Sequence, residues 1–389
     1  MKKEDLKFFD DAREEMTHLL CRLIEKDTTN PPGNEERAAR VMHEFLDENG
    51  ITFADYEKEP GRTNVVATIG GGRPALLVAA HLDVVPAGEG WDTEPFKPTI
   101  RDGRVYGRGT VDNKGQLAAM LVCAKFIKEH KSEMNGSLVL VGAADEERGS
   151  AMGLDYLVKE NLVDADAAII PDIANNMRRI SVGEKGLVRV KVESRGIQAH
   201  ASTPDLGFNA IWPLVEFLHR FRKAAFEGAE HALFSPPTKN VGIIKGGAAV
   251  NIVPAHAEVE IDFRYLPGTT ADEIIAKVNA LVEETAAACP GSKLECTRFE
   301  NLPPFVVSTD EPLVKLIRKN AKDVLGIDVE LMGMAGTTVC KQLIEKGIVS
   351  VGYSCGDNGI AHIANEYIAI DEMVDFAKVM AAIILDFCG

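Results

Sequence analysis

Short apolar runs alternate with segments of helical periodicity over the first 180 residues of this chain. Three of the runs, Ala75–Ala80, Ser137–Gly142 and Ala167–Ile170, are dominated by apolar residues, as is typical of strands buried on both faces of a sheet. Between the first two, Gly115–His130 repeats apolar positions at helical spacing. Because strands that alternate with helices form mostly parallel sheets, we predict an α/β fold with a mostly parallel sheet. Two earlier helices are expected at Glu4–Asp27 and Asn34–Asn49.

The pattern changes near residue 185. Residues Leu187–Glu193 alternate apolar and polar positions, which indicates a sheet with one face in water. A helix, two strands, a helix and a last strand are expected next, giving the β-α-β-β-α-β order of a ferredoxin-like α+β domain. These segments are Asn209–Phe226, Asn240–Lys245, Ala257–Tyr265, Ala271–Ala287 and Lys293–Phe299.

The earlier character returns from residue 301, with helices expected at Glu311–Leu325 and Asp371–Cys388. A chain of 389 residues is also too long for one ordinary core. We therefore predict a discontinuous larger domain, residues 1–184 and 301–389, into which a smaller domain, residues 185–300, is inserted.

Composition excludes several classes of function. Lys and Arg number 43 against 59 Asp and Glu, a net charge of −16, which argues against nucleic-acid binding because phosphate neutralisation supplies most of that affinity. No apolar run approaches the roughly 20 residues that a membrane helix needs. The seven cysteines are scattered without a Cys-x-x-Cys pair, as is typical of reduced thiols. We expect a cytoplasmic protein that binds neither nucleic acid nor a membrane.

Imidazole and carboxylate side chains follow the buried runs of the predicted sheet. Active sites of open α/β sheets lie beyond the carboxyl ends of the strands, so these side chains are expected to meet at one edge. Two histidines with several carboxylates and no thiolate suit Zn²⁺, Co²⁺ or Mn²⁺. The residues, in chain order, are His81, Asp83, Asp112, Glu146, Glu147, Asp172 and His362.

Each of these signals has an ordinary explanation when it is taken alone. His81-x-Asp83 is typical of a capped turn, although positions i and i+2 of an extended chain point the same way and would let Asp83 hold the second ring nitrogen of His81. The run Asp145–Glu147 is typical of a solvated loop or the acidic first turn of a helix. Asp172 alone is typical of a turn. Only the joint placement favours a metal site.

A rival signal is the Gly-x-Ser-x-Gly pattern at Gly352–Gly356, which is typical of the nucleophile elbow of serine hydrolases. That elbow turns from a strand directly into a helix, whereas Asp357-Asn358-Gly359 is poor helix material. A glycine-rich loop that presents His362 is the better interpretation.

Taken together, the segments resemble the signatures of the M20 metallopeptidase family over nearly the whole chain. The family includes acetylornithine deacetylases, succinyl-diaminopimelate desuccinylases, aminoacylases and glutamate carboxypeptidases. The segments that carry the resemblance are His81–Val85, Gly107–Gly115, Asp145–Ser150 and Gly359–His362 with Glu366. It implies a zinc-hydrolase catalytic domain of α/β fold with an inserted ferredoxin-like lid.

The resemblance also implies a pair of zinc ions, with cobalt or manganese as alternatives. His81, the bridging Asp112 and Asp172 would hold one ion, and Asp112, Glu147 and His362 would hold the other.

Further roles come from the same resemblance. Glu146 would be the general base and Asp83 would support His81. The peptide bond between Asp112 and Asn113 is expected to be cis.

Residues of the inserted domain resemble positions of the family's lid. The resemblance implies that His200, in Gln198–Ser202, stabilises the oxyanion, often across a homodimer formed through the lid. It also implies that Arg264 and Asn251 bind substrate. Without it, His200 is typical of a strand-end surface residue, Arg264 of a surface ion pair and Asn251 of a turn.

The family's substrate loop corresponds to Gly336-Thr337, but Thr338 stands where an Asp is common. Asp172, where deacylases more often carry Glu, favours the carboxypeptidase and dipeptidase branches. The implied function is hydrolysis of the amide bond of an N-acyl amino acid or short peptide. A dipeptidase or carboxypeptidase is the nearest alternative, and a non-catalytic binding protein or a serine hydrolase are the more remote ones.

Overall fold

The computed structural model describes residues 1–226, 228 and 230–389, which fold into two compact units. The first unit consists of residues 1–182, 307–332 and 338–389, and the second of residues 183–306 and 333–337. Among the described residues, no helix combines the length and the apolar character needed to cross a membrane.

A largely parallel sheet forms the centre of the first unit. Strands β3 (Ala75–His81), β6 (Ser137–Ala143), β7 (Ala167–Ala174) and β15 (Val349–Ser354) are parallel and lie in the order β6-β3-β7-β15. Every residue of β3 and β6 is buried, so the apolar runs are strands covered on both faces. The predicted α/β class is confirmed.

Antiparallel strands flank this centre, and the sequence did not reveal them. β1 (Phe53–Glu57) pairs with β2 (Thr63–Gly70), and β2 pairs with β6, while β8 (Arg179–Glu184) joins β15. Residues of β1 are mostly exposed, which removes the apolar pattern by which a strand is detected. The remaining short strands of the chain are β4 (Thr99–Arg101), β5 (Arg104–Tyr106), β13 (Phe305–Val306), β14 (Glu330–Met334) and β16 (Tyr367–Ala369).

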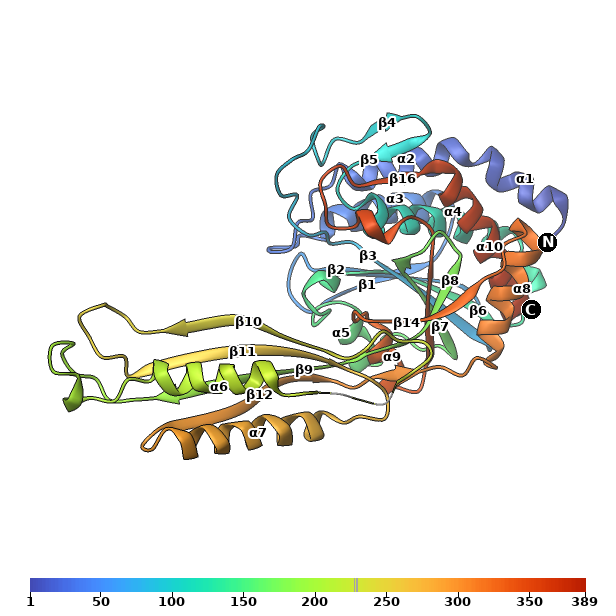
Figure 1. Cartoon of the computed structure of the whole chain (residues 1–389). Coiled ribbons are helices and arrows are strands. Elements are labelled where there is room, and N and C mark those ends of the chain that lie inside the picture. The colour runs from blue at the N-terminus through green and yellow to red at the C-terminus, as the bar shows by residue number, and fades with distance from the viewer. Residues whose placement is uncertain (227, 229) are drawn as a thin grey trace. The chain divides into compact units, whose positions relative to one another are not determined.

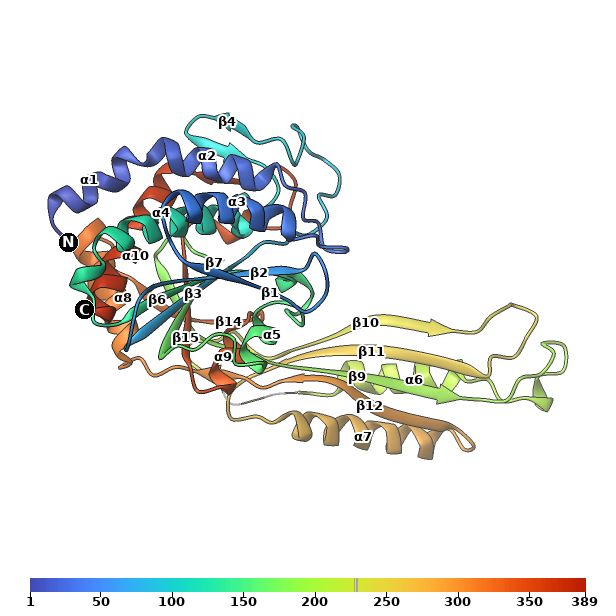
Figure 2. The same cartoon turned by 180° about the vertical axis from the view of Figure 1, so that it is seen from behind.

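Helices cover both faces of the central sheet (Figures 1 and 2). On one face lie α2 (Arg13–Ile24), α3 (Glu36–Glu48), α4 (Gly115–Glu129) and α10 (Ile370–Cys388), and α8 (Pro312–Leu325) packs against α10. The short helices α5 (Leu154–Lys159) and α9 (Cys340–Glu345) lie on the other face.

The prediction of one helix over Glu4–Asp27 was wrong, because the segment forms α1 (Lys3–Asp11) and α2 with a break at Ala12. Phe9 of α1 lies 5.0 Å from Phe126 of α4, ring centre to ring centre, and α2 also packs on α4. The break allows two successive segments to press their apolar faces on the same helix.

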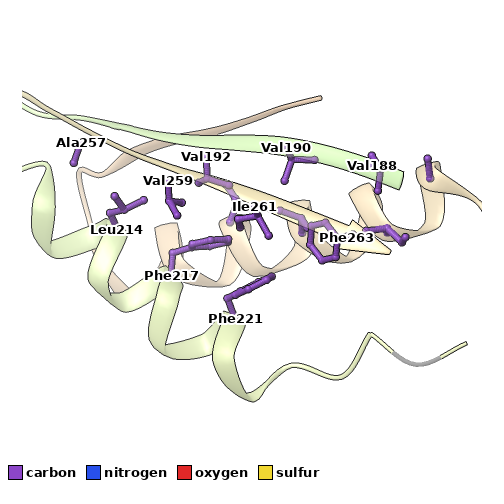
Figure 3. Close-up of a cluster of buried hydrophobic side chains, with 14 of the residues drawn as sticks. Val188, Val190, Val192, Leu214, Phe217, Phe221, Ala257, Val259, Ile261 and Phe263 are labelled. Atoms are coloured by element: carbon purple, nitrogen blue, oxygen red, sulfur yellow. The ribbon is translucent and has the colours of Figure 1, made fainter. Parts of the chain in front are cut away.

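The second unit has the predicted ferredoxin-like order, with an antiparallel sheet β10-β11-β9-β12. Its core consists of alternate residues of β9 and β11 packed against α6 and α7, and Phe217, Phe221 and Phe263 contribute aromatic rings to it (Figure 3). Helix α7 begins with a capping box in which Thr270 and Glu273 satisfy each other's backbone N–H groups. The elements are β9 (Gly186–Arg195), α6 (Ile211–Lys223), β10 (Thr238–Gly246), β11 (His256–Tyr265), α7 (Ala271–Ala288) and β12 (Lys293–Leu302).

Candidate metal centre

Side chains from five separate segments meet at the carboxyl edge of the parallel strands. His81 is the last residue of β3, Asp172 lies in β7, and Glu147 is in the short turn after β6. Asp112 lies just before α4, and His362 lies in the loop after β15. The sequence predicted that these side chains would meet at one edge of the sheet, because they follow buried strands.

The carboxylate of Asp112 lies between two histidines. Its Oδ1 is 2.9 Å from Nε2 of His81, and its Oδ2 is 2.9 Å from Nε2 of His362. Asp172 Oδ1 lies 3.7 Å from the same nitrogen of His81, and Glu147 Oε1 lies 3.2 Å from that of His362. Two three-residue groups therefore share one carboxylate, which is the geometry of a bridging ligand.

The ring of His81 is oriented by the residue two positions further on. Its Nδ1 lies 2.9 Å from the backbone carbonyl oxygen of Asp83 and 3.5 Å from the Asp83 carboxylate. Since a carbonyl oxygen only accepts, Nδ1 carries the hydrogen and Nε2 is left to face Asp112. The carboxylate of Asp83, which we expected to hold the ring, mainly accepts the N–H groups of Glu146 and Glu147 at 3.0 and 3.2 Å.

Both imidazoles are surrounded by negative charge. Burial lowers the pKa of His81, but hydrogen bonds to Asp112, Asp172 and Asp83 outweigh it and raise that pKa well above its ordinary value. Hydrogen bonds to Asp112 and Glu147 raise the pKa of His362 to about 10. Each Nε2 therefore sits where a positive charge is stabilised.

These residues fit a pair of divalent cations. Donor atoms of His81, Asp112 and Glu147 lie within 4.8 Å of one another, as do those of His81, Glu146 and Asp172. The set consists of nitrogen and oxygen donors, as Zn²⁺, Co²⁺ and Mn²⁺ accept. A cation bound at Nε2 of either histidine would take the place of the proton on that nitrogen, and the nitrogen lone pair would coordinate it.

Glu146 has the environment of a proton acceptor. Burial raises its pKa well above the ordinary value, and the charge of nearby Asp172 adds to the effect. A carboxylate whose pKa is raised holds a proton more readily than an exposed one, which suits it to accept and return a proton.

A buried carboxylate holds the loop that carries Asp112. Glu366 accepts the N–H groups of Gly109, Val111 and Asp112 at 2.8–3.2 Å and pairs with Nη1 of Arg108 at 2.5 Å. Both side chains of this ion pair are fully buried. The peptide bond between Asp112 and Asn113 is cis, as expected.

Glu366→Ala is expected to lower the free energy of unfolding by about 3–5 kcal/mol, because it leaves a buried guanidinium without its partner. Urea denaturation measures the change. Asp371→Ala is the matched control, since Asp371 is 76% exposed in its pair with Arg13 and should cost no more than about 1 kcal/mol. Equal losses in the two variants would contradict the anchoring role of Glu366.

The serine of the Gly-x-Ser-x-Gly pattern does not have the geometry of a nucleophile. Ser354 is fully buried at the end of β15. Its hydroxyl donates to the carbonyl of Cys355 and accepts from Gln116. The chain continues into a short turn at Asn358–Ile360, where an elbow requires a helix.

The predicted residues of the second unit form two groups. His200 and Asn251 lie on paired segments, because Ala201 N–H donates to the Asn251 carbonyl at 3.1 Å. His200 Nδ1 accepts the N–H of Ser202 at 3.1 Å, so the hydrogen of the neutral ring is on Nε2.

The other group surrounds the guanidinium of Arg264. Its Nε donates to Asp262 at 2.9 Å and its Nη1 to Thr337 at 3.4 Å. This contact brings the predicted substrate loop, Gly336-Thr337, next to Arg264.

Sequence reasoning missed a polar network behind the turn of Glu146. Asn30, Glu35 and Arg62 precede the recognised motifs, and they contact Asp145, the first residue of the motif Asp145–Ser150. The run Asn30-Pro31-Pro32-Gly33, two positions before Glu35, is visible in the sequence as a rigid turn, but nothing in it indicates which distant residue it contacts.

Comparison with known proteins gives consistent matches. The model of peptidase family M20/M25/M40 matches residues 77–386. An uncharacterised metallohydrolase of Methanocaldococcus jannaschii is 30% identical over 96% of this chain and 100% of its own length. An acetylornithine deacetylase of Myxococcus xanthus is 31% identical over 95% of this chain and 97% of its own. The crystal structure of a Staphylococcus aureus tripeptidase has a TM-score of 0.78 at 26% identity, covering 97% of this chain and 98% of that one.

Proposed function

This chain belongs to the M20 metallopeptidase family and is a metal-dependent amidohydrolase, and on that premise we propose that it hydrolyses the amide bond of an N-acyl amino acid or a short peptide with two zinc ions. The observation that carries the proposal is the carboxylate of Asp112 between His81 and His362, with Glu146 beside the cluster. Cobalt or manganese are alternative ions, since imidazole and carboxylate donors bind them as well.

When bound, such ions lower the pKa of a water molecule and polarise the scissile carbonyl group. The chain's own residues then set the course of the reaction. Glu146 accepts a proton from the attacking water and returns it to the leaving amine. Asp83 and the backbone of its neighbours hold His81 and the Glu146 turn in place.

The second unit supplies candidate substrate contacts. We assign stabilisation of the oxyanion to His200, whose Nε2–H is free to donate in the neutral ring, because such donors act where charge develops in the transition state. Arg264, with its planar fork of donors, is suited to bind a substrate carboxylate. Asn251 and the Gly336-Thr337 loop keep their proposed roles in substrate binding.

These contacts favour a homodimer. His200 and Asn251 lie beyond the His256 end of β11, whereas Arg264 lies near its other end. Arg264 is eight positions after His256 on the same strand, which separates them by roughly 26 Å, whereas a dipeptide spans only about 7 Å. One small substrate therefore cannot touch both groups of one chain.

The sheet edge offers a surface for the second copy. β10 ends the sheet order, and Val241, Ile243 and Ile244 on it are 38%, 43% and 58% exposed. Helix α6 exposes Trp212 by 67%. Exposed apolar side chains on an unpaired edge strand are suited to pairing with another chain. We propose that two copies join through this unit, so that the partner's His200 completes each site.

Mixing two inactive variants tests the shared site. Glu146→Gln lacks the base and His200→Ala lacks the oxyanion donor, but a mixed dimer has one site with both groups. After co-expression or refolding together, activity should recover to about a quarter of the wild-type value. Each variant alone is the control. Recovery to no more than the sum of the two controls would show that His200 acts within its own chain.

Within this function, two substrate classes have to be distinguished, acyl amino acids and short peptides. Asp172 favours the peptidase branches, as the sequence resemblance implied. The similarity to a deacetylase and to a tripeptidase, each nearly full-length, leaves both classes to be assayed.

A hydrolysis screen tests the proposal directly. The protein, loaded with zinc, cobalt or manganese, is incubated with N-acetyl and N-succinyl amino acids and with di- and tripeptides, and released amine is measured. We expect turnover of at least one class and its loss on chelation. Tightly bound metal without turnover would favour a binding protein, and turnover that survives chelation would favour a serine hydrolase. A cytoplasmic location stays a prediction.

A further inference from the structure

A buried ion pair lies behind the turn that carries Glu146. Arg62 donates from Nε and Nη2 to the two carboxylate oxygens of Glu35, at 2.7 and 2.8 Å. The same Nη2 donates to Oδ1 of Asp145 at 2.9 Å. The side chain of Glu35 is fully buried, and those of Asp145 and Arg62 are 6% and 11% exposed. The guanidinium thus joins the N-terminal segment to the residue before Glu146.

Asp145 needs this support because its backbone is in the left-handed region. Its φ is 61°, a conformation that few non-glycine residues adopt without help from their surroundings. The Asp145 N–H donates to Glu35 at 3.1 Å, and its carboxylate also accepts from Asn30 at 3.0 Å. Backbone and side chain of Asp145 are therefore held by the same ion pair.

The far side of the turn rests on Asp83. The Asn30 amide donates to Asp83 at 2.8 Å as well as to Asp145, and Asp83 accepts the Glu146 N–H. The backbone of Glu146 is thus held by Asp83, and the residue before it, Asp145, is held by Arg62. A misplacement of a catalytic group by about 1 Å can cost on the order of a hundredfold in rate. The position of this turn therefore affects how well Glu146 can act as a base.

We propose that Arg62 is a positioning residue for Glu146: clamped by Glu35, its guanidinium fixes Asp145 and so sets the direction of the Glu146 carboxylate. The proposal rests on the proposed hydrolase function. Most metal-ligating side chains, namely those of His81, Asp112, Asp172 and His362, come from other segments of the chain, so Arg62 affects the base more than the ions.

Arg62→Met tests this assignment. We expect kcat to fall about 10- to 100-fold, with KM and metal content close to those of the wild type. The matched control is Arg40→Met, which removes an exposed arginine paired with Glu36 and should leave kcat unchanged. A wild-type kcat in Arg62→Met, or a loss of metal that accounts for the loss of rate, overturns the proposal.

A pair of glycine variants tests the same point without removing any charge. Gly33 and Gly61 both have positive φ, at 97° and 82°. A Cβ on Gly33 would meet Arg62 Nε at 2.5 Å, whereas a Cβ on Gly61 has no atom within 4 Å. Gly33→Ala should therefore reduce kcat in the manner of Arg62→Met, and Gly61→Ala should not. Equal kcat values in the two variants contradict the proposal even if Arg62→Met is insoluble.

A readout independent of catalysis separates this proposal from the proposed function. In Gly33→Ala, the amides of residues 145–147 should exchange hydrogen faster than in Gly61→Ala, while those of β3 exchange as in the wild type. Faster exchange in a protein that hydrolyses none of the screened substrates would reject the hydrolase function and keep the positioning role. Unchanged exchange in an active hydrolase would reject the positioning role alone.

Discussion

Replacing Glu146 with glutamine is expected to reduce kcat by about a thousandfold while the protein keeps its metal. Glutamine has the same shape but cannot accept a proton, and general acid–base catalysis contributes roughly 10²- to 10⁴-fold to rates. Glu146 is proposed to act twice, on the water and on the leaving amine, so the loss should lie in the upper part of this range. Turnover of the best substrate and metal content by mass spectrometry are the two measurements.

Glu160→Gln is a suitable control, because Glu160 is an exposed carboxylate at the end of α5. It should behave as the wild type in both measurements. Near-normal turnover of Glu146→Gln would remove the base from the proposed mechanism. Loss of metal from that variant would instead show that Glu146 is a metal ligand. Its donor atoms lie close enough to those of His81 and Asp172 for that role.

Asp112→Asn should affect both ions at once. Its carboxylate faces His81 with one oxygen and His362 with the other, and an amide offers only one oxygen and no charge. We expect both ions to be weakened and turnover to fall by about a thousandfold, since cations of this kind contribute several kcal/mol to stabilising the transition state.

His362→Asn is the matched comparison, because His362 belongs to one of the two groups only. It should lower the metal content by about one ion per chain, whereas Asp112→Asn lowers it by more. Metal content after gel filtration distinguishes the two. The same loss in both variants would contradict a bridging Asp112.

The central strands and the site residues were visible in the sequence for the same physical reason. A strand buried on both faces is mostly apolar, as β3 is up to Ala80 and β6 is from Leu138, so an ionisable residue at or just after its end is conspicuous. His81 and Asp145–Glu147 stand in such positions. β1 carries no such signal, because most of its residues are exposed at the sheet edge.

The residues that hold the site in place could not be found from the sequence, because their contacts are made between distant segments of the chain. Arg62 contacts Glu35 across 27 positions and Asp145 across 83, and such pairing depends on the tertiary fold instead of local pattern. The role of Asp83 was only partly predictable: the i, i+2 spacing placed it beside His81, but the fold directs its carboxylate to the N–H groups of Glu146 and Glu147.

The most direct test of the account is anomalous diffraction from a crystal of the zinc-loaded protein. We predict two anomalous peaks, one on each side of the Asp112 carboxylate, the first beside Nε2 of His81 and the second beside Nε2 of His362. A folded protein whose zinc-loaded crystals show no peak among these side chains would contradict the central claim.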